Sequence, residues 1–175
     1  MGDIRRPRKK WRGPTNPWIS SALGDEMRLL GKYGLRNKRE LYVAAAVARK
    51  YRRMERSFFA LPPEERTARE SELIKRLYEA GYLPSPEGTS DAVLSMGVEA
   101  VLERRLQSLV ANKLGISQHA ARQLVVHGHV RVNGRRLRSP GALINRGDEG
   151  GIEVEVLTVA SSEHQGQSGA EVKQQ

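Results

Sequence analysis

The chain has 175 residues and a formal net charge of +10, from 30 Lys and Arg against 20 Asp and Glu. It holds no cysteine, which excludes disulfides, thiolate zinc sites, iron–sulfur clusters and cysteine nucleophiles. No apolar run approaches the roughly 18–20 residues that span a bilayer, and the charged N-terminus is not a secretory signal. We therefore expect a soluble, intracellular protein with no membrane partner.

The basic residues are concentrated in two blocks. Residues 1–60 carry a net charge of +11, residues 61–100 a net charge of −4, and residues 101–160 a net charge of +4. An excess as large as that of the first block repels itself unless an anion is present. The distribution therefore predicts a polyanion, such as a nucleic acid, as the partner.

Residues 1–20 are predicted to form a flexible basic arm, because prolines and like charges both oppose a helix. Its cations and prolines are Arg5, Arg6, Arg8, Lys9, Lys10, Arg12, Pro7, Pro14 and Pro17. Trp11 and Trp18 also lie in this arm, and two roles are open for them. They stack on bases, or they hold the arm against the body of the protein.

A helical N-terminal domain is expected over residues 21–100. Asn37 followed by Glu40 has the spacing of an N-cap with a capping residue three positions later. Proline and glycine mark the helix ends. The expected helices cover about residues 21–32, 38–60 and 63–79, and end near Gly34, Pro62 and Gly81.

The long helix at 38–60 has two different faces on a helical wheel. One arc of about 80° is apolar and holds Val43, Val47, Tyr51, Met54 and Phe58. The opposite arc of about 100° is basic and holds Arg49, Arg52, Arg53 and Arg56, diluted only by Glu55. Solvated helix faces usually mix both signs of charge. An arginine face of this kind suits phosphate, so we expect it to contact nucleic acid.

The second half of the chain predicts a helix–helix–strand–strand–strand unit over residues 101–160. A helix is expected over 98–114, closed by Gly115, and Ser117 is a natural N-cap for a second helix that ends at Gly128. The fold class is therefore α+β. A tail at residues 161–175 has too few apolar side chains to offset its ordering entropy, so we expect it to be disordered.

Asn133-Gly134 is a strong signal for a hairpin with a type I′ turn. A two-residue loop pairs Val132 with Arg135 and Arg131 with Arg136, which places the two latter arginines face to face on the solvent side. Like charges opposite each other in a ladder destabilise it. We therefore interpret Arg131 and Arg136 as a clamp for a bridging phosphate.

These residues carry a resemblance to a known family. The run LERRLQSLVANKLGISQHAARQLVVHGHVRVNGRRLRSP, with Gly147-Asp148 after it, resembles the RNA-binding domain named after small-subunit ribosomal protein S-four. GKYGLRNKREL at residues 31–41 resembles the archaeal and eukaryotic branch of that ribosomal protein family. One departure is Gln107, which stands where the domain pattern usually has Asp.

The resemblance covers residues 3–160 and implies a structural constituent of the small ribosomal subunit. It implies a primary binder of ribosomal RNA that docks at a multi-helix junction, helps nucleate subunit assembly and influences decoding accuracy. The implied partners are small-subunit rRNA, neighbouring small-subunit proteins and messenger RNA near its entry path, in the cytoplasm. The residues predicted to contact RNA are Arg36, Lys38, Arg39, Arg49, Arg52, Arg53, Arg56, Arg105, Ser117, Gln118, Arg122, Gln123, Arg131, Asn133, Arg135 and Arg136.

No catalytic pattern is visible, so we expect no enzyme activity, no cofactor and no metal. The four histidines form no His-Glu-x-x-His array, and neither a Walker loop nor a dinucleotide-binding glycine motif occurs. Two alternatives use the same RNA-binding domain. One is an RNA-modifying enzyme such as a pseudouridine synthase, and the other is a ribosome quality-control factor.

Overall fold

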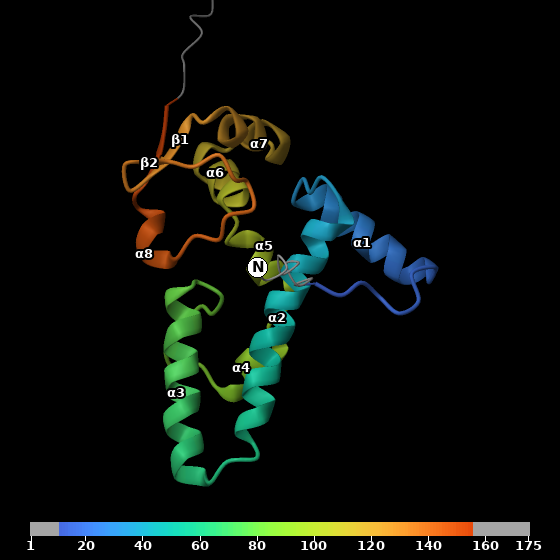
Figure 1. Cartoon of the computed structure of the whole chain (residues 1–175). Helices are drawn as coiled ribbons and strands as arrows, with labels where there is room; N and C mark the ends of the chain where they lie inside the picture. The colour runs from blue at the N-terminus through green and yellow to red at the C-terminus, as the bar shows by residue number, and fades with distance from the viewer. Residues whose placement is uncertain (1–10, 156–175) are drawn as a thin grey trace, which may run out of the picture.

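The computed structural model describes residues 11–155 and confirms the α+β class (Figure 1). Most of the basic arm's cations and the whole tail at 161–175 lie outside the described residues, so the expectations for them stay predictions. The elements, in chain order, are α1 Ser20–Lys32, α2 Lys38–Phe58, α3 Pro63–Glu79, α4 Ser90–Ser95, α5 Val98–Glu103, α6 Leu106–Leu114, α7 Gln118–His127, β1 Val130–Val132, β2 Arg135–Arg136, α8 Arg146–Glu149 and β3 Ile152–Val154.

The expected helix boundaries are largely confirmed, because they depend on local chemistry. The side chain of Asn37 accepts a hydrogen bond from the backbone N–H of Glu40 at 3.1 Å. The side chain of Ser117 accepts one from the N–H of Ala120 at 3.2 Å. Pro63 is the first residue of α3, a position where its missing N–H costs nothing. Gly115 and Gly128 end α6 and α7 in the left-handed conformation.

Helices α1 to α5 surround a first core cluster, in which α2 packs against α3, α4 and α5. The buried residues of α2 are Leu41, Ala44, Ala48 and Glu55. They form a face of the helix beside the predicted apolar arc. That arc is only partly buried against the cluster, and Val43 at its end is exposed. Helix α2 therefore packs on the first cluster with two adjacent faces, the apolar arc and a deeper face that carries small alanines.

The expected continuous helix at 98–114 is broken at Arg104 and Arg105. Arg105 has an extended backbone (φ −72°, ψ 141°) and forms an isolated antiparallel bridge with Leu143. The N–H of Leu106 donates to the carbonyl of Ala142 at 2.8 Å, and the N–H of Ile144 donates to the carbonyl of Arg104 at 3.0 Å. The break occurs because these backbone groups bond to the 140–144 segment instead of to the helix.

Helices α6 and α7 pack on the three-stranded sheet, in the order β2-β1-β3, around a second core cluster that begins at Leu106. Val130 and Val132 are buried and Leu137 is partly buried, as the predicted register requires. The hairpin turn is also confirmed, since Asn133 and Gly134 have φ values of +49° and +75°. The first cluster includes Val101 and Leu102, and the second begins at Leu106. The domain boundary near residue 101 stays a prediction.

Candidate nucleic-acid interface

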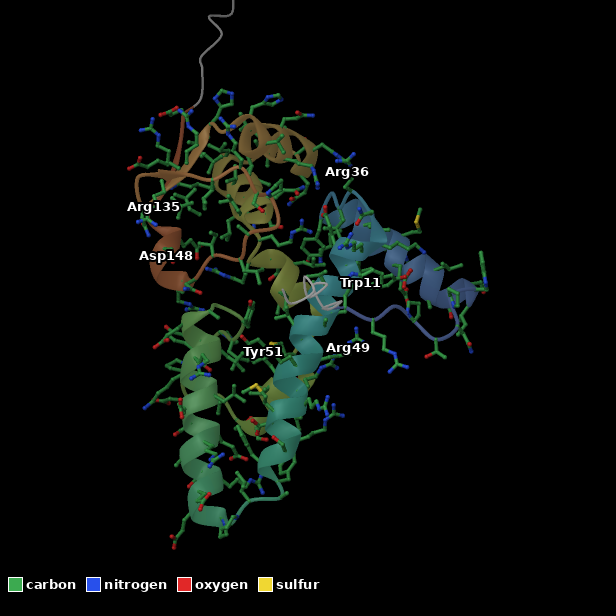
Figure 2. All side chains as sticks on the ribbon, viewed as in Figure 1. Trp11, Arg36, Arg49, Tyr51, Arg135 and Asp148 are labelled. Atoms are coloured by element: carbon green, nitrogen blue, oxygen red, sulfur yellow. The ribbon has the colours of Figure 1, made fainter. Side chains whose placement is uncertain are left out.

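The arginine face of α2 points away from the rest of the protein. Figure 2 shows Arg49 on the side of α2 away from α3 and Tyr51 on the side toward α3. Arg53 and Arg56 are exposed, and neither has an ion pair among residues 11–155. The nearby carboxylate, Glu55, is fully buried on another face. The surface is therefore a run of cations with no internal anion to neutralise it, which is the arrangement that phosphate binding requires.

Glu55 does not dilute this surface, contrary to the sequence-based expectation. Its Oε1 accepts a hydrogen bond from Ser90 Oγ at 2.6 Å, at the start of α4. Its Oε2 is buried and has no hydrogen-bond partner among the described residues, and the same holds for Nε of Arg52. Arg52 is half-buried at the edge of the arginine face, so its stem packs inside while the exposed arginines lie beside it.

The predicted cations just before and at the start of α2 have different surroundings. Arg36 is exposed and lies in the turn before α2 (Figure 2). Lys38 Nζ lies 2.9 Å from Glu26 Oε2. The guanidinium of Arg39 lies 6.0 Å from the centre of the Trp11 ring. Lys38 is therefore paired, whereas Arg36 and Arg39 are exposed and have no ion pair in the described part of the chain.

The two tryptophans, whose role the sequence left open, behave differently. Trp11 stacks on Tyr42 of α2, with ring centroids 5.8 Å apart and an interplanar angle of 23°. The main chain beside it is held as well, because Arg49 Nη2 donates to the carbonyl of Arg12 at 3.1 Å. Trp18, in contrast, is 86% exposed. Trp11 therefore packs the first described residues of the arm against α2, whereas Trp18 does not.

A second basic surface lies on the β1–β2 hairpin. Arg131 pairs with Arg136 across the ladder, as predicted. Glu155, however, places Oε1 2.7 Å from Arg131 Nη2 and Oε2 3.8 Å from Arg136 Nη2. The expected uncompensated repulsion is therefore corrected: a carboxylate from the end of β3 occupies the position that we assigned to a phosphate.

The cations at the edge of this hairpin are exposed to solvent. Arg135 is exposed and has no ion pair within residues 11–155. Arg138, which the sequence reading missed, is also exposed. A Cβ at Gly128 would lie 3.1 Å from Nε of Arg138 and 3.1 Å from Cδ of Arg136, so both side chains cover the C-terminal end of α7. The basic run at 135–138 was the signal for Arg138.

The two basic surfaces are separate. Figure 2 shows Arg135 beside β2 and Arg49 on the opposite side of the molecule. An RNA that contacts both surfaces must present phosphates to more than one side of the protein. The placement of the cations therefore favours recognition of a folded RNA by its shape and phosphates.

Arg105 and Arg122, both predicted to contact RNA, point into the protein instead. Arg105 is 5% exposed, and its Nη2 lies 2.8 Å from Glu40 Oε2. Arg122 Nη2 lies 3.0 Å from the other carboxylate oxygen of Glu40. Burial alone raises the pKa of Glu40, but the hydrogen bonds from Arg122 and Arg105 outweigh it and hold that pKa below its usual value. Glu40 therefore joins α2 to two elements of the second cluster and is not the capping residue that its spacing predicted.

Gln107 completes this connection. Its Nε2 donates to three carbonyls, those of Tyr33, Gly34 and Gln118, at 3.3, 3.2 and 3.0 Å. Arg122 Nη1 also approaches Gln107 Oε1 at 3.4 Å. Aspartate cannot donate these bonds, which explains physically why an amide suits this position. We call Glu40, Arg105, Gln107 and Arg122 the interdomain lock.

The remaining predicted contacts have local roles. The side chain of Ser117 caps α7, and Oε1 of Gln118 is buried without a hydrogen-bond partner in the described part of the chain. Gln123 is exposed and lies 3.2 Å from His127 Nε2. Asn133 Nδ2 donates to Asp148 Oδ1 at 2.7 Å and fixes the hairpin turn to α8. Ser117 and Asn133 therefore shape the surface.

Within residues 11–155, no group of three or more His, Asp or Glu side chains is arranged to hold a metal ion. Among the same residues, no helix combines the length and apolar character that crossing a bilayer requires.

Comparison with known proteins identifies the family. Residues 104–149 match the model of the S4 domain. The chain is 52% identical to small ribosomal subunit protein uS4 of Ignicoccus hospitalis over 150 residues, which cover 85% of this chain and 90% of that protein. It is 47% identical to the uS4 protein of Metallosphaera sedula over 154 residues, which cover 87% of this chain and 86% of that protein. The chain therefore belongs to the uS4 family of small ribosomal subunit proteins.

Proposed function

We propose that this chain is a structural component of the small ribosomal subunit that binds ribosomal RNA through the α2 and hairpin surfaces. The observation that carries the proposal is the α2 face, where Arg49, Arg53 and Arg56 are exposed without an ion pair among the described residues. Membership in the uS4 family supports the same assignment. The coverage of most of both chains argues against the RNA-modifying and quality-control alternatives.

The RNA contacts that we propose are fewer than those predicted from the sequence. They comprise the outward-facing cations Arg36, Arg49, Arg53, Arg56, Arg135, Arg136 and Arg138, with Arg52, Arg39 and Arg131 at their edges. Arg105 and Arg122 act instead by fixing the angle between the two surfaces. RNA that contacts both surfaces then requires a fixed separation between them, which the interdomain lock supplies.

The experiment that tests this function is quantitative mass spectrometry of ribosomal subunits separated from cells that express the chain. One copy per small subunit, with none in the large subunit, is expected for a structural component. A modifying enzyme or a quality-control factor would be present well below one copy per subunit, or would follow the large subunit. Either of these outcomes would contradict the proposal.

A finer part of the proposal is that the chain joins the subunit early and influences decoding, as the resemblance in the sequence implies. Early joining predicts that depletion of the chain causes incomplete small-subunit particles to accumulate. If depletion leaves the yield of complete small subunits unchanged, this part of the proposal is wrong, whereas the assignment to the subunit stands.

A further inference from the structure

The outer half of α1 and the segment that leads into it, residues 13–27, form a projecting arm. Figure 1 shows this segment running out from α2 to the far end of α1 and returning along the helix. No residue of α1 is buried, and only Leu29 and Leu30, near its C-terminal end, pack against the first core cluster. We call residues 13–27 the α1 arm.

The α1 arm exposes large apolar side chains. Trp18 is 86% exposed, Met27 is 62% exposed and Ile19 is 49% exposed. Ile19, Leu23 and Met27 follow each other at intervals of four, so they form one stripe along the helix. Such spacing is typical of a helix that lays one side into an apolar groove of a partner. Left in water, the stripe keeps apolar area exposed that burial would stabilise.

Most of the arm also lacks charge. Residues 13–24 are the longest stretch of the sequence without Asp, Glu, Lys or Arg, in a chain of which 29% is charged. The charges that follow are already engaged, since Asp25 lies 3.9 Å from Arg28 and Glu26 holds both Lys38 and Tyr42. The arm therefore offers a phosphate no unpaired cation, in contrast to the arginine face of α2.

We infer that the α1 arm is a protein-docking element that inserts into an uncharged apolar groove on a neighbouring protein of the small subunit. This inference rests on the proposed function. The apolar stripe supplies the buried centre of the interface, and the uncharged polar residues Thr15, Asn16, Ser20 and Ser21 supply hydrogen bonds at its rim. A groove lined by charged residues does not match, because residues 13–24 carry no charge and the two carboxylates of the arm already pair with Arg28 and Lys38.

Photo-crosslinking in assembled subunits tests this inference. Small subunits are purified from cells in which Met27 of the full chain is replaced by photo-methionine, irradiated, and treated with ribonuclease. We expect one adduct with a single small-subunit protein that survives the ribonuclease. A photoreactive residue in place of Arg53 is the control, and its adduct should be with rRNA and sensitive to the ribonuclease.

The other outcomes separate this inference from the proposed function. A ribonuclease-sensitive adduct at position 27, or none in subunits that contain the chain, overturns the docking role alone. Absence of the chain from the small subunits contradicts the proposed function and this inference together. The double variant Ile19→Glu, Met27→Glu, with photo-leucine in place of Leu23, should lose roughly tenfold or more of the protein adduct. The double variant Ala68→Glu, Ser71→Glu on the exposed face of α3, with the same photo-leucine at position 23, is its charge-matched control and should lose none.

Discussion

Glu40 holds Arg105, 65 positions later in the chain, through a 2.8 Å ion pair that joins the two core clusters. Replacement by Gln removes the countercharge of a nearly buried guanidinium and weakens the bond to Arg122. Breaking a buried pair in this way typically costs about 3 kcal/mol of unfolding free energy, so Glu40→Gln should destabilise by that order in urea denaturation. Glu72→Gln, which breaks the exposed pair with Arg76, should cost less than about 0.5 kcal/mol. Equal losses of unfolding free energy in the two variants would contradict a stabilising role of the interdomain lock.

The same pair predicts a pH dependence. The folded pKa of Glu40 lies below its ordinary value, so its contribution to stability is fully present above the unfolded pKa of about 4.3. That contribution is lost as the pH falls through the folded pKa. The difference in unfolding free energy between the wild type and Glu40→Gln should therefore be constant from pH 7 to 5 and shrink toward pH 3. A difference that stays constant or grows as the pH falls to 3 would contradict a lowered folded pKa of Glu40.

Gln107 offers a test of why an amide replaces the carboxylate of the family pattern. Gln107→Glu keeps the shape of the side chain but turns a donor to three carbonyls into a buried anion facing them. We expect a loss of about 2 kcal/mol or more in unfolding free energy. Gln123→Glu on the exposed side of α7 is the matched control and should change stability by less than about 0.5 kcal/mol. A neutral Gln107→Glu would mean that these bonds contribute little.

Glu155 pairs with Arg131 and Arg136, so on the proposed hairpin surface it would compete with an RNA phosphate for both arginines. Glu155→Gln should free both arginines and raise the affinity for rRNA, while the unfolding free energy falls by no more than about 1 kcal/mol, since the pairs are exposed. Arg131→Ser should weaken RNA binding by about 1–3 kcal/mol. Contrary to the expectation from the sequence, it should not stabilise the free protein, because Glu155 already offsets the repulsion. If Glu155→Gln leaves the RNA affinity unchanged, this face of the hairpin does not contact RNA.

Local signals in the sequence predicted much of the fold. Asn37, Ser117 and the Asn133-Gly134 turn act through neighbours within a few residues, so their roles follow from spacing alone. The break at Arg104 and Arg105 did not follow, since it depends on backbone bonds to residues 140–144. Tertiary contacts of this kind leave no periodic trace in the sequence.

In the candidate site, too, local features could be predicted from the sequence and features that depend on tertiary contacts could not. The arginine face of α2 follows from helical geometry and is observed. The inward direction of Arg105 and Arg122 depends on Glu40, which the sequence places at a helix start for a different reason. A basic residue in a domain motif therefore does not reveal whether it binds the ligand or orients the surface that does.

The most direct measurement is the salt dependence of binding between the full chain and intact small-subunit rRNA. Each phosphate contact contributes about −0.7 to −0.9 to the slope of log affinity against log salt concentration. We predict a steep slope for the wild type and a slope shallower by about 2–3 for the triple variant Arg49→Gln, Arg53→Gln, Arg56→Gln. The variant Arg69→Gln, Lys75→Gln, Arg76→Gln removes the same charge from α3 and should keep nearly the wild-type slope. A flat wild-type slope, or equal slopes in the two triple variants, would contradict RNA binding through the arginine face of α2.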